Sequence, residues 1–403
     1  MAICTASGNQ LFPQITTDGS GGAIITWQDN RLGTITEWDI YVQRVYTSGN
    51  VPSSWPPNGV AICTVGNPQY RPQITTDGSG GAIITWEDER SDNTDIYARR
   101  VDASGTRQWT ALGVAICTAS GHQYIPQIIS DGSGGAIITW YDYRGTTRMY
   151  DIYAQRVNAS GSVQWSPNGV AICTAIDRQE YPTITTDGAG GAIIAWNDYR
   201  YSTISHCDIY AQRVNALGTA QWGISGVAMC AASGDQDFPQ IIGDGSGGAI
   251  ITWDEYNSAT KSDIYAQRVN GSGFIQWGTS GQPICTASGG QYSPKITTDG
   301  SGGAIIAWYD YSSDITWYDI YAQRVSGSGS MQWGTYGVAI CMAGGDQESP
   351  KITTDGSGGA IIVWEDYRNS SEYSDIYAQQ IGKDGTLGKT HRSLPFLPLL
   401  LLE

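Results

Sequence analysis

The chain has 403 residues and a formal net charge of −16. Proteins that bind a nucleic-acid backbone need clustered lysine and arginine, and no such cluster occurs here, so nucleic acid is excluded as the expected partner. The chain contains 52 glycines, so its glycine content is nearly twice the usual share of about 7%. Most of them stand at repeated positions, which indicates turns and not disorder.

One ten-residue stretch, DGSGGAIITW at Asp77–Trp86, occurs seven times with small variations, at intervals of 54–59 residues. A period of this size, filled with strand-forming residues, is typical of an array of identical small sheets. Repeats of this kind cannot bury a face alone and stack into one body. The seven copies begin at Asp18, Asp77, Asp131, Asp187, Asp244, Asp299 and Asp355.

Each repeat predicts four strands, here described for the second copy. The first strand is expected at Pro72–Thr76, because proline suits a strand entry where no ladder donor is required. Asp77–Gly81 then turns the chain, with glycines that accept positive φ. The second strand, Ala82–Trp86, is apolar on both sides of its pleat and must therefore be covered on both faces.

The third strand begins at a repeated Asp-Ile-Tyr, as in Asp95–Val101, and ends in a hairpin signal. The fourth strand follows a repeated Gln-Trp and a bend, as in Gly169–Cys173. Four antiparallel strands in each of seven repeats predict an all-β, seven-bladed β-propeller. Closure of the ring removes the two sheet edges that an open array would expose.

The two ends of the repeat array complement each other. Met1–Cys4 is a fragment of a fourth strand, whereas the seventh repeat has strands one to three and no fourth strand of its own. We therefore expect the N-terminal strand to complete the last sheet. Residues 1–388 are predicted to form this single propeller, and residues 389–403 a non-repeat tail that is disordered or a cloning remnant.

We expect no signal peptide before the repeats, and the apolar tail is too short to span a bilayer. An extracytoplasmic location is expected for the parent protein. The motifs ITTDGSGGAIITW and DIYAQRV resemble the repeats of bacterial β-propellers of the SBBP and NHL type, and the repeated Trp and Asp resemble WD-type propellers. The resemblance implies the fold only, because propellers of this class include lectins, lyases, hydrolases and protein-interaction platforms.

Residues that recur in every copy are interpreted as scaffold. A tryptophan ends each second strand and is expected to pack between sheets. An acidic residue stands two places after this tryptophan. It could bind a metal or act as an acid or base. The alternative is a structural role, in which it forms a hydrogen-bonded corner and pairs with the third-strand arginine. The tryptophans are Trp27, Trp86, Trp140, Trp196, Trp253, Trp308 and Trp364. The acids are Asp29, Asp88, Asp142, Asp198, Glu255, Asp310 and Asp366.

A glutamine before each first-strand proline is expected to satisfy backbone groups of the crossing loop that leads into the strand. Seven cysteines also occupy one repeated position and are interpreted as small buried apolar residues. Cys207 stands outside this pattern and is predicted to be the exposed or reactive thiol. The glutamines are Gln10, Gln69, Gln123, Gln179, Gln236, Gln291 and Gln347. The repeated cysteines are Cys4, Cys63, Cys117, Cys173, Cys230, Cys285 and Cys341.

Function is expected where the copies differ. Two loop families vary, namely the crossing loop and the loop between the second and third strands. In a propeller both emerge on the same face, which makes that face a recognition surface. The ligand-binding candidates on these loops are Trp38, Tyr70, Arg71, Tyr150, Tyr201, Trp317 and Tyr318.

The leading hypothesis is a non-catalytic, monomeric binding propeller for a glycan or a protein partner, because sugar CH faces stack on Trp and Tyr. The alternative is a polysaccharide- or ester-active lyase or hydrolase centred on His122 and His206, with Tyr124, Arg178 and Glu180 nearby. A third hypothesis is a structural repeat domain of a larger surface protein. No cofactor is expected, although a structural cation such as calcium is left open.

Overall fold

The computed structural model describes residues 2–31, 33, 38–144, 149–201, 207–230, 232, 234–257, 261–312 and 317–388. The tail predicted at 389–403 lies outside this part of the chain. The described residues form 27 strands and no helix, and the strands are arranged in seven antiparallel sheets.

The strand order within each sheet follows the chain. The first sheet contains β1 (Gln10–Thr17), β2 (Ala23–Asp29), β3 (Asp39–Val45) and β4 (Val60–Cys63). The second contains β5 (Gln69–Thr76), β6 (Ala82–Asp88), β7 (Asp95–Val101) and β8 (Val114–Cys117). The third contains β9 (Gln123–Ser130), β10 (Ala136–Asp142), β11 (Asp151–Val157) and β12 (Val170–Cys173).

The remaining sheets repeat this pattern. The fourth contains β13 (Gln179–Thr186), β14 (Ala192–Asp198), β15 (Asp208–Val214) and β16 (Val227–Cys230). The fifth contains β17 (Asp235–Gly243), β18 (Ala249–Asn257), β19 (Lys261–Val269) and β20 (Gln282–Cys285). The sixth contains β21 (Gly289–Thr298), β22 (Ala304–Ser312), β23 (Asp319–Val325) and β24 (Val338–Cys341). The seventh contains β25 (Gln347–Thr354), β26 (Ala360–Asp366) and β27 (Asp375–Ile381).

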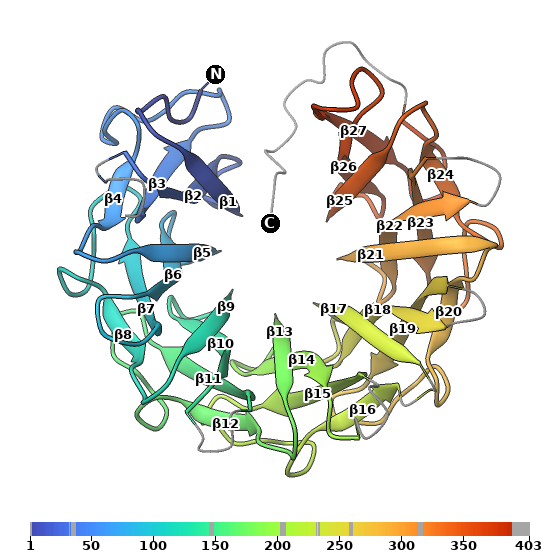
Figure 1. Ribbon diagram of the computed structural model, residues 1–403, viewed down its shortest axis with the longest axis horizontal. Coiled ribbons are helices and arrows are strands. Elements are labelled where there is room, and N and C mark those ends of the chain that lie inside the picture. The colour runs from blue at the N-terminus through green and yellow to red at the C-terminus, as the bar shows by residue number, and fades with distance from the viewer. Residues whose placement is uncertain are drawn as a thin grey trace.

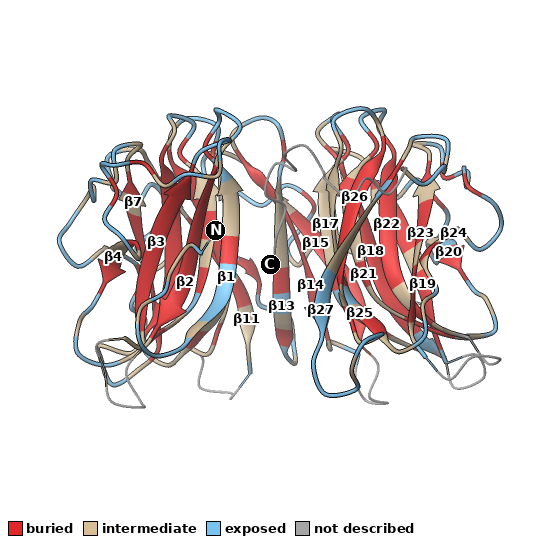
Figure 2. Cartoon of the chain, turned by 90° about the horizontal axis from the view of Figure 1, so that it is seen from above, coloured by how far each residue is buried: buried red, intermediate tan, exposed pale blue. Residues whose placement is uncertain are grey.

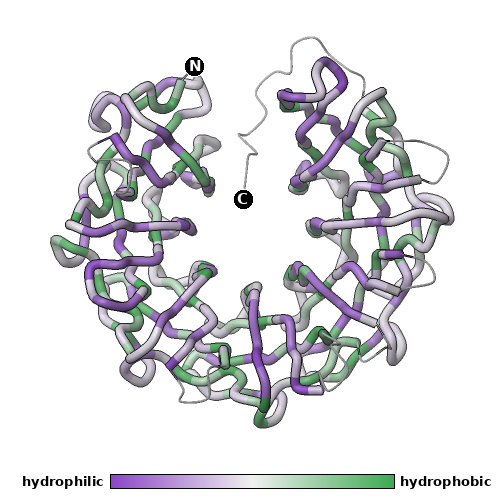
Figure 3. Tube along the Cα trace, in the orientation of Figure 1, coloured by the Kyte–Doolittle hydropathy of each residue, from purple (hydrophilic) through white to green (hydrophobic). Residues whose placement is uncertain are grey.

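The sheets are arranged radially around a central opening, with the first strand of each innermost and the fourth outermost (Figure 1). Hydrophilic residues follow the innermost strands (Figure 3), whereas the middle strands are the most buried (Figure 2). The fold is therefore a seven-bladed β-propeller, as the sequence predicts. The predicted bounds of the third strand are confirmed, and the first strand begins earlier than predicted, at Gln69 instead of Pro72.

Each first strand contains a β-bulge at the residue before its proline, where the register with the second strand shifts. This residue has a positive φ in all seven sheets although none of the seven is glycine, which is a costly conformation for a bulky side chain. Its N–H group is turned toward the preceding sheet, as in the bond of 2.7 Å from Ile125 N to Glu87 Oε1. The seven residues are Phe12, Arg71, Ile125, Tyr181, Phe238, Ser293 and Ser349.

The glycine turn is held by its own aspartate. Oδ1 of Asp131 accepts hydrogen bonds of 2.8 Å from Ser133 N and Gly135 N, while Oδ2 pairs with Arg156 at 2.8 Å. A Cβ atom on Gly135 would lie 2.2 Å from Val157 O, which explains why glycine is needed there. The third-strand arginine therefore pairs with the turn aspartate, and its expected pairing with the acid after the second-strand tryptophan is wrong.

The contact between two consecutive sheets, here called a seam, repeats one polar arrangement. The third-strand arginine donates from Nη1 across the seam to a carbonyl of the next sheet, at 2.8–3.3 Å. The tryptophan of the Gln-Trp pair, or Trp55 in the first sheet, donates to the same carbonyl at 3.0–3.2 Å. The accepting residues are Ala103, Ala159, Ala216, Gly271, Gly327 and Lys383.

Apolar side chains complete each seam. The second-strand tryptophans are buried, and six clusters each combine residues of two consecutive sheets, for example Ile152 and Ile172 of the third with Ile194 and Trp196 of the fourth. The predicted packing of these tryptophans between sheets is confirmed. The seven repeated cysteines are free thiols and are buried apart from the half-buried Cys4 and Cys341, which agrees with their predicted role.

The seventh sheet has three strands, and β27 forms an exposed edge (Figure 2). Ile376 in β27 is 53% exposed, whereas its counterpart Ile320 in the sixth sheet is 0% exposed. Residues 2–9 form no strand, and Ile3 and Cys4 pack against the first sheet, across the gap from β27 in Figure 1. The predicted pairing of the N-terminal strand with β27 is not formed in this structure, and ring closure stays a prediction.

Cys4 nevertheless makes the contact that a fourth-strand cysteine makes with the sheet that follows it. Its Sγ lies 3.1 Å from Arg31 Nη2, and Cys117 Sγ lies 3.2 Å from Arg144 Nη2 in the equivalent seam. Within each complete sheet this cysteine is the Cα partner of the isoleucine of Asp-Ile-Tyr, as for Ile320 and Cys341. Closure would therefore place Cys4 opposite Ile376.

We predict that Ile376→Cys forms a disulfide with Cys4 under mild oxidation, because directly opposed strand residues meet the distance requirement for the bond. Peptide mapping by mass spectrometry measures the cross-link. Ile320→Cys with Cys341 is the matched control, since that pair is already opposed. A cross-link in the control and none between positions 4 and 376 would contradict closure.

Candidate functional site

The crossing loops and the second-to-third loops meet on one face of the propeller, as predicted. In five sheets the N–H group of the first-strand glutamine bonds to the carbonyl that precedes Asp-Ile-Tyr in the preceding sheet, as in Gln123 N to Thr94 O at 2.8 Å. The glutamine amide then donates to crossing-loop carbonyls, as in Gln123 Nε2 to Gly121 O at 3.3 Å. The predicted structural role of these glutamines is confirmed.

Two clusters of tyrosines lie on this face at equivalent positions of the third and sixth sheets. In the third sheet Tyr141 and Tyr150 have ring centroids 5.0 Å apart in an edge-to-face arrangement. In the sixth sheet Tyr309 and Tyr318 have the same arrangement at 5.1 Å. Such pairs add to the stabilisation that burial gives. The third-sheet cluster is Tyr124, Tyr141, Tyr143 and Tyr150. The sixth-sheet cluster is Tyr292, Tyr309, Tyr311 and Tyr318.

Carboxylates of the neighbouring sheets flank both clusters. Burial raises the pKa of Tyr141, and the negative charges of Glu87 and Glu180 raise it further. Burial likewise raises the pKa of Tyr309, with Glu348 and Asp254 as additional causes. Each cluster therefore combines aromatic faces with acceptor oxygens, which is a combination suited to polyhydroxylated ligands.

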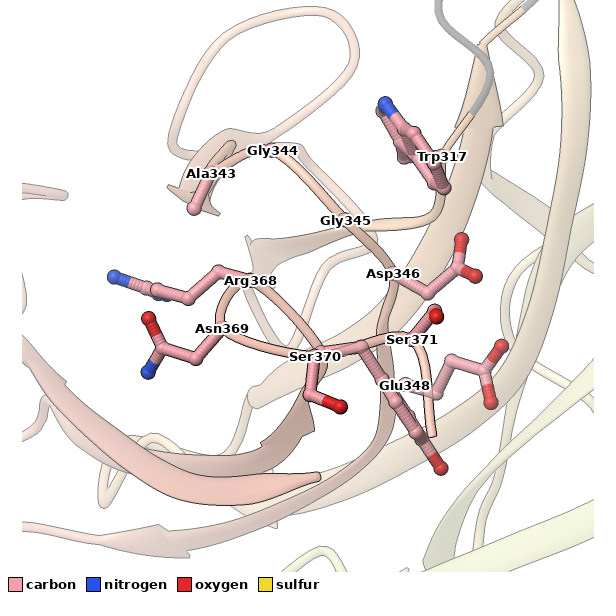
Figure 4. A pocket seen from close by; sticks show the side chains of 11 residues that line it. Trp317, Ala343, Gly344, Gly345, Asp346, Glu348, Arg368, Asn369, Ser370 and Ser371 are labelled. Atoms are coloured by element: carbon pink, nitrogen blue, oxygen red, sulfur yellow. The ribbon is translucent and has the colours of Figure 1, made fainter. Parts of the chain in front are cut away.

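A pocket of about 740 Å³ opens beside the sixth-sheet cluster, where loops of the sixth and seventh sheets meet (Figure 4). This volume lies within the range of about 300–1,000 Å³ that is usual for small-ligand sites. Trp317 is 43% exposed and lies toward one side with Asp346 and Glu348, whereas Arg368 and Asn369 lie toward the other. The lining residues are Trp317, Ala343, Gly344, Gly345, Asp346, Glu348, Tyr367, Arg368, Asn369, Ser370 and Ser371.

The polar groups of this pocket are held in place by the scaffold. Asp346 Oδ1 accepts the N–H of Tyr318 at 3.0 Å, and Arg368 pairs with Asp366 at 2.5 Å. Burial raises the pKa of Glu348, and the charges of Asp346 and Glu365 add to the effect. Since Asp366 compensates the charge of Arg368, two carboxylates determine the electrostatic character of the pocket.

A second acidic element lies in the fifth sheet, where Asp237 and Asp254 are direct partners on adjacent strands. Asp254 is buried, and burial raises its pKa to about 7, with the charge of Asp237 as a further cause. Asp237 in turn accepts a hydrogen bond of 2.8 Å from Asn197 of the fourth sheet. Two carboxyl groups with different environments can hold one proton between them near neutral pH.

The catalytic candidates occupy different seams. His122 stacks on Tyr124 with centroids 5.6 Å apart, and its Nδ1 accepts the N–H of Thr94 at 3.1 Å. Asp235 occupies the equivalent position of the fifth sheet and accepts a hydrogen bond of 3.0 Å from the N–H of Cys207. His122 therefore makes a loop contact that an aspartate makes in another sheet. His206 lies outside the described residues.

Arg178 and Glu180, the other catalytic candidates, lie 3.9 Å apart in an ion pair of the fourth sheet. Glu180 belongs to the acids around the third-sheet tyrosines, while Arg178 covers the ring of Tyr199 at 4.1 Å. These two residues thus contact the scaffold of the same face, and their catalytic role stays a prediction.

The ligand-binding candidates are spread over five sheets. Trp317 and Tyr318 adjoin the pocket, Tyr150 lies in the third-sheet cluster, and Tyr201 is 68% exposed on the fourth sheet. Tyr70, Arg71 and the half-buried Trp38 belong to the first and second sheets, where Arg71 pairs with Glu87 at 3.1 Å.

The prediction that Cys207 is exposed or reactive is wrong. Cys207 is 2% exposed, and burial raises the pKa of its thiol, which disfavours the nucleophilic thiolate. The N–H bond from Cys207 to Asp235 holds this part of the loop against the next sheet.

The sequence analysis missed Asp254, Tyr309, Asp346 and Glu348. Asp254 and Tyr309 each follow a second-strand tryptophan directly, at a position that varies among the repeats and could have been found by comparing them. Within the described residues, no group of three or more His, Cys, Asp or Glu side chains is arranged to hold a metal ion. The same part of the chain contains no helix long and apolar enough to cross a membrane.

No protein-family model and no curated protein matches the sequence. Among solved structures, a protein of unknown function from Dyadobacter fermentans is 8% identical, with 93% of this chain and 95% of that chain covered and a TM-score of 0.47. An α-L-arabinanase from Penicillium chrysogenum complexed with arabinobiose is 12% identical, with 77% and 92% covered and a TM-score of 0.45. An endo-arabinase from Bacteroides thetaiotaomicron is 12% identical, with 77% and 93% covered and a TM-score of 0.37. Similarity this distant carries no information about ligand or reaction.

We predict that Asp254→Asn raises stability at pH 8 and leaves it nearly unchanged at pH 4. The pKa of about 7 in the folded protein lies above the ordinary aspartate pKa of 3.8, so the wild-type protein loses stability as the pH rises between these values. Thermal unfolding at several pH values measures the difference.

Asp366→Asn is the control, because its expected effect on stability at pH 8 has the opposite sign. Burial alone would raise the pKa of Asp366, but hydrogen bonds from Arg368 and Trp364 lower it overall, so this variant should lose stability at pH 8. Equal effects of the two substitutions at pH 8 would contradict the assigned environment of Asp254.

Proposed function

We propose that the protein binds a neutral glycan in the pocket between the sixth and seventh sheets. The observation that supports this most is the exposed face of Trp317 beside the carboxylates of Asp346 and Glu348 in a cavity of about 740 Å³. The CH face of a sugar stacks on an indole ring, and its hydroxyl groups donate to carboxylate oxygens.

The charge of the pocket narrows the ligand class. The carboxylates of Asp346 and Glu348 repel an anionic polysaccharide, and Arg368 does not offset them because Asp366 already neutralises it. A neutral oligosaccharide is not repelled by these carboxylates, and its binding does not carry the desolvation cost of burying a charged ligand. A basic peptide is the competing ligand that the same carboxylates would attract.

We predict that Trp317→Ala and Glu348→Gln each weaken binding of a neutral oligosaccharide by about tenfold or more, which corresponds to about 1.4 kcal/mol. Isothermal titration against a panel of neutral glycans, followed by titration of both variants, measures the affinity. Phe274→Ala is the matched control, because Phe274 is an exposed aromatic residue outside the pocket. Unchanged affinity in both variants, or binding of basic peptides alone, would refute the proposal.

A second candidate function is hydrolysis of a polysaccharide, and the Asp237–Asp254 pair of the fifth sheet favours it. Glycoside hydrolysis uses two carboxyl groups, one of which must be protonated at the working pH. A pKa near 7 keeps Asp254 available as the acid. Burial and the charge of Asp235 raise the pKa of Asp237 as well, while the hydrogen bond from Asn197 acts in the opposite direction. In this alternative the reacting groups are carboxyls and not His122.

We predict for this alternative that release of reducing ends from a polysaccharide panel falls as the pH rises above about 7, because the acid form of Asp254 is lost. Asp254→Asn should lower turnover by about 100-fold or more. Asp263→Asn, which changes an aspartate on the neighbouring strand β19, serves as the control. Turnover that is equal in Asp254→Asn and the wild type would exclude this pair.

Three broader expectations stay proposals. They are membership of the SBBP and NHL type of repeat, an extracytoplasmic location and a monomeric state. Sedimentation of the purified chain would test the last of these.

A further inference from the structure

A second cavity, here called the central cavity, lies in the opening around which the innermost strands are arranged (Figure 1). Its volume is about 260 Å³, which is below the range of about 300–1,000 Å³ that is usual for drug-sized ligands. Each of the seven sheets contributes to its lining the residue that follows the first-strand proline. An occupant of this cavity would therefore be small and within reach of several sheets.

The residues at this position are polar, and none of the seven is a carboxylate. Four sheets have glutamine there, the fourth sheet has threonine, and the sixth and seventh sheets have lysine. The whole chain has five lysines and a net charge of −16, so two lysines at equivalent positions of consecutive sheets concentrate positive charge in an otherwise acidic protein. The glutamines are Gln14, Gln73, Gln127 and Gln240, and the lysines are Lys295 and Lys351.

Side chains at this position reach from one sheet to the next. Lys295 Nζ of the sixth sheet lies 3.5 Å from Gln240 Oε1 of the fifth sheet. Lys351 occupies the same position in the seventh sheet, and β25 packs against β21 as β21 packs against β17. Both ammonium groups can therefore contact one small ligand that lies between them.

The glutamine amides add further donors to the same cavity. Gln240 Nε2 donates one hydrogen bond of 2.9 Å to Pro239 O, and the second hydrogen of this amide can donate to a ligand. Tyr181 and Phe238 supply apolar surface to the lining. Apolar surroundings lower the local dielectric constant, which strengthens the attraction between opposite charges.

We propose that a small oxyanion with two negative charges, of the phosphate or dicarboxylate class, binds in the central cavity between Lys295 and Lys351. The two ammonium groups donate charge-assisted hydrogen bonds to its oxygen atoms, and glutamine amides donate to the remaining oxygens. Adjacent ammonium groups repel each other, and an anion that bridges them offsets this repulsion. The site is separate from the proposed glycan pocket and does not depend on it.

Isothermal titration with inorganic phosphate and, separately, with succinate tests the proposal at an ionic strength held constant with sodium chloride. We expect saturable binding of at least one of these anions at one site per chain. The tighter of the two shows whether the site prefers a tetrahedral anion or a pair of carboxylates. Absence of saturable binding for both anions would overturn the proposal.

Lys295→Gln and Lys351→Gln each introduce the residue that four sister sheets have at this position, so the fold should tolerate them. Each variant is expected to weaken the affinity by about tenfold or more, because one charge-assisted contact is lost. Lys383→Gln is the matched control, since it removes the same charge from an exposed residue outside the central cavity. Unchanged affinity in both lysine variants, or an equal loss in Lys383→Gln, would also overturn the proposal.

Discussion

The ion pair between the turn aspartate and the third-strand arginine is the constraint on which the remaining structure depends. One carboxylate closes its own turn through two N–H groups and holds the arginine, whose free nitrogen then reaches the next sheet. A single buried interaction therefore couples the geometry within a sheet to the position of its neighbour. In the seventh sheet the uncharged Gln380 takes the place of the arginine and donates a hydrogen bond of 3.1 Å to Asp355, and that sheet is the one with an exposed edge strand.

The same constraint determines where variation is tolerated. The arginine contacts fix each sheet at the glycine-turn end, and the glutamine N–H bonds fix it at the crossing-loop end. Between them, the residue before each proline and the residue after each second-strand tryptophan face a neighbouring sheet at fixed positions. Substitutions there change the chemistry of the face and leave the scaffold intact. Tyr141, Tyr309 and Asp254 directly follow the second-strand tryptophan, and Tyr124, Tyr292, Asp237 and Glu348 occupy the first-strand residue that adjoins the one before the proline.

Much of the fold can be predicted from the sequence because the same pattern of strands and turns occurs in seven copies. The glycine turn, the doubly buried second strand and the strand starting at Asp-Ile-Tyr each have a local physical cause that sequence displays. The arginine partner was not predictable in this way, since register places Arg156 opposite the turn end of the second strand and away from Asp142. Cys207 was misjudged because a loop position suggested exposure, whereas a bond to the next sheet buries it.

The candidate site was predictable only in part. Trp317 and Tyr318 could be chosen because their loops differ among repeats. Asp346 and Glu348 acquire their role only when a crossing loop meets the second-to-third loops of two sheets, which is a tertiary property. The pKa of Asp254 depends on burial and on a neighbour seventeen residues away in sequence but opposite in register.

A double-mutant cycle between Asp131 and Arg156 tests this account most directly. The unfolding free energies of the two single alanine variants and the double variant give the coupling energy between the residues. The account predicts a coupling of about 2 kcal/mol or more, because either single substitution leaves the other charge without its partner in a largely buried seam. A coupling below about 0.5 kcal/mol would contradict it, since the two residues would then contribute independently to stability.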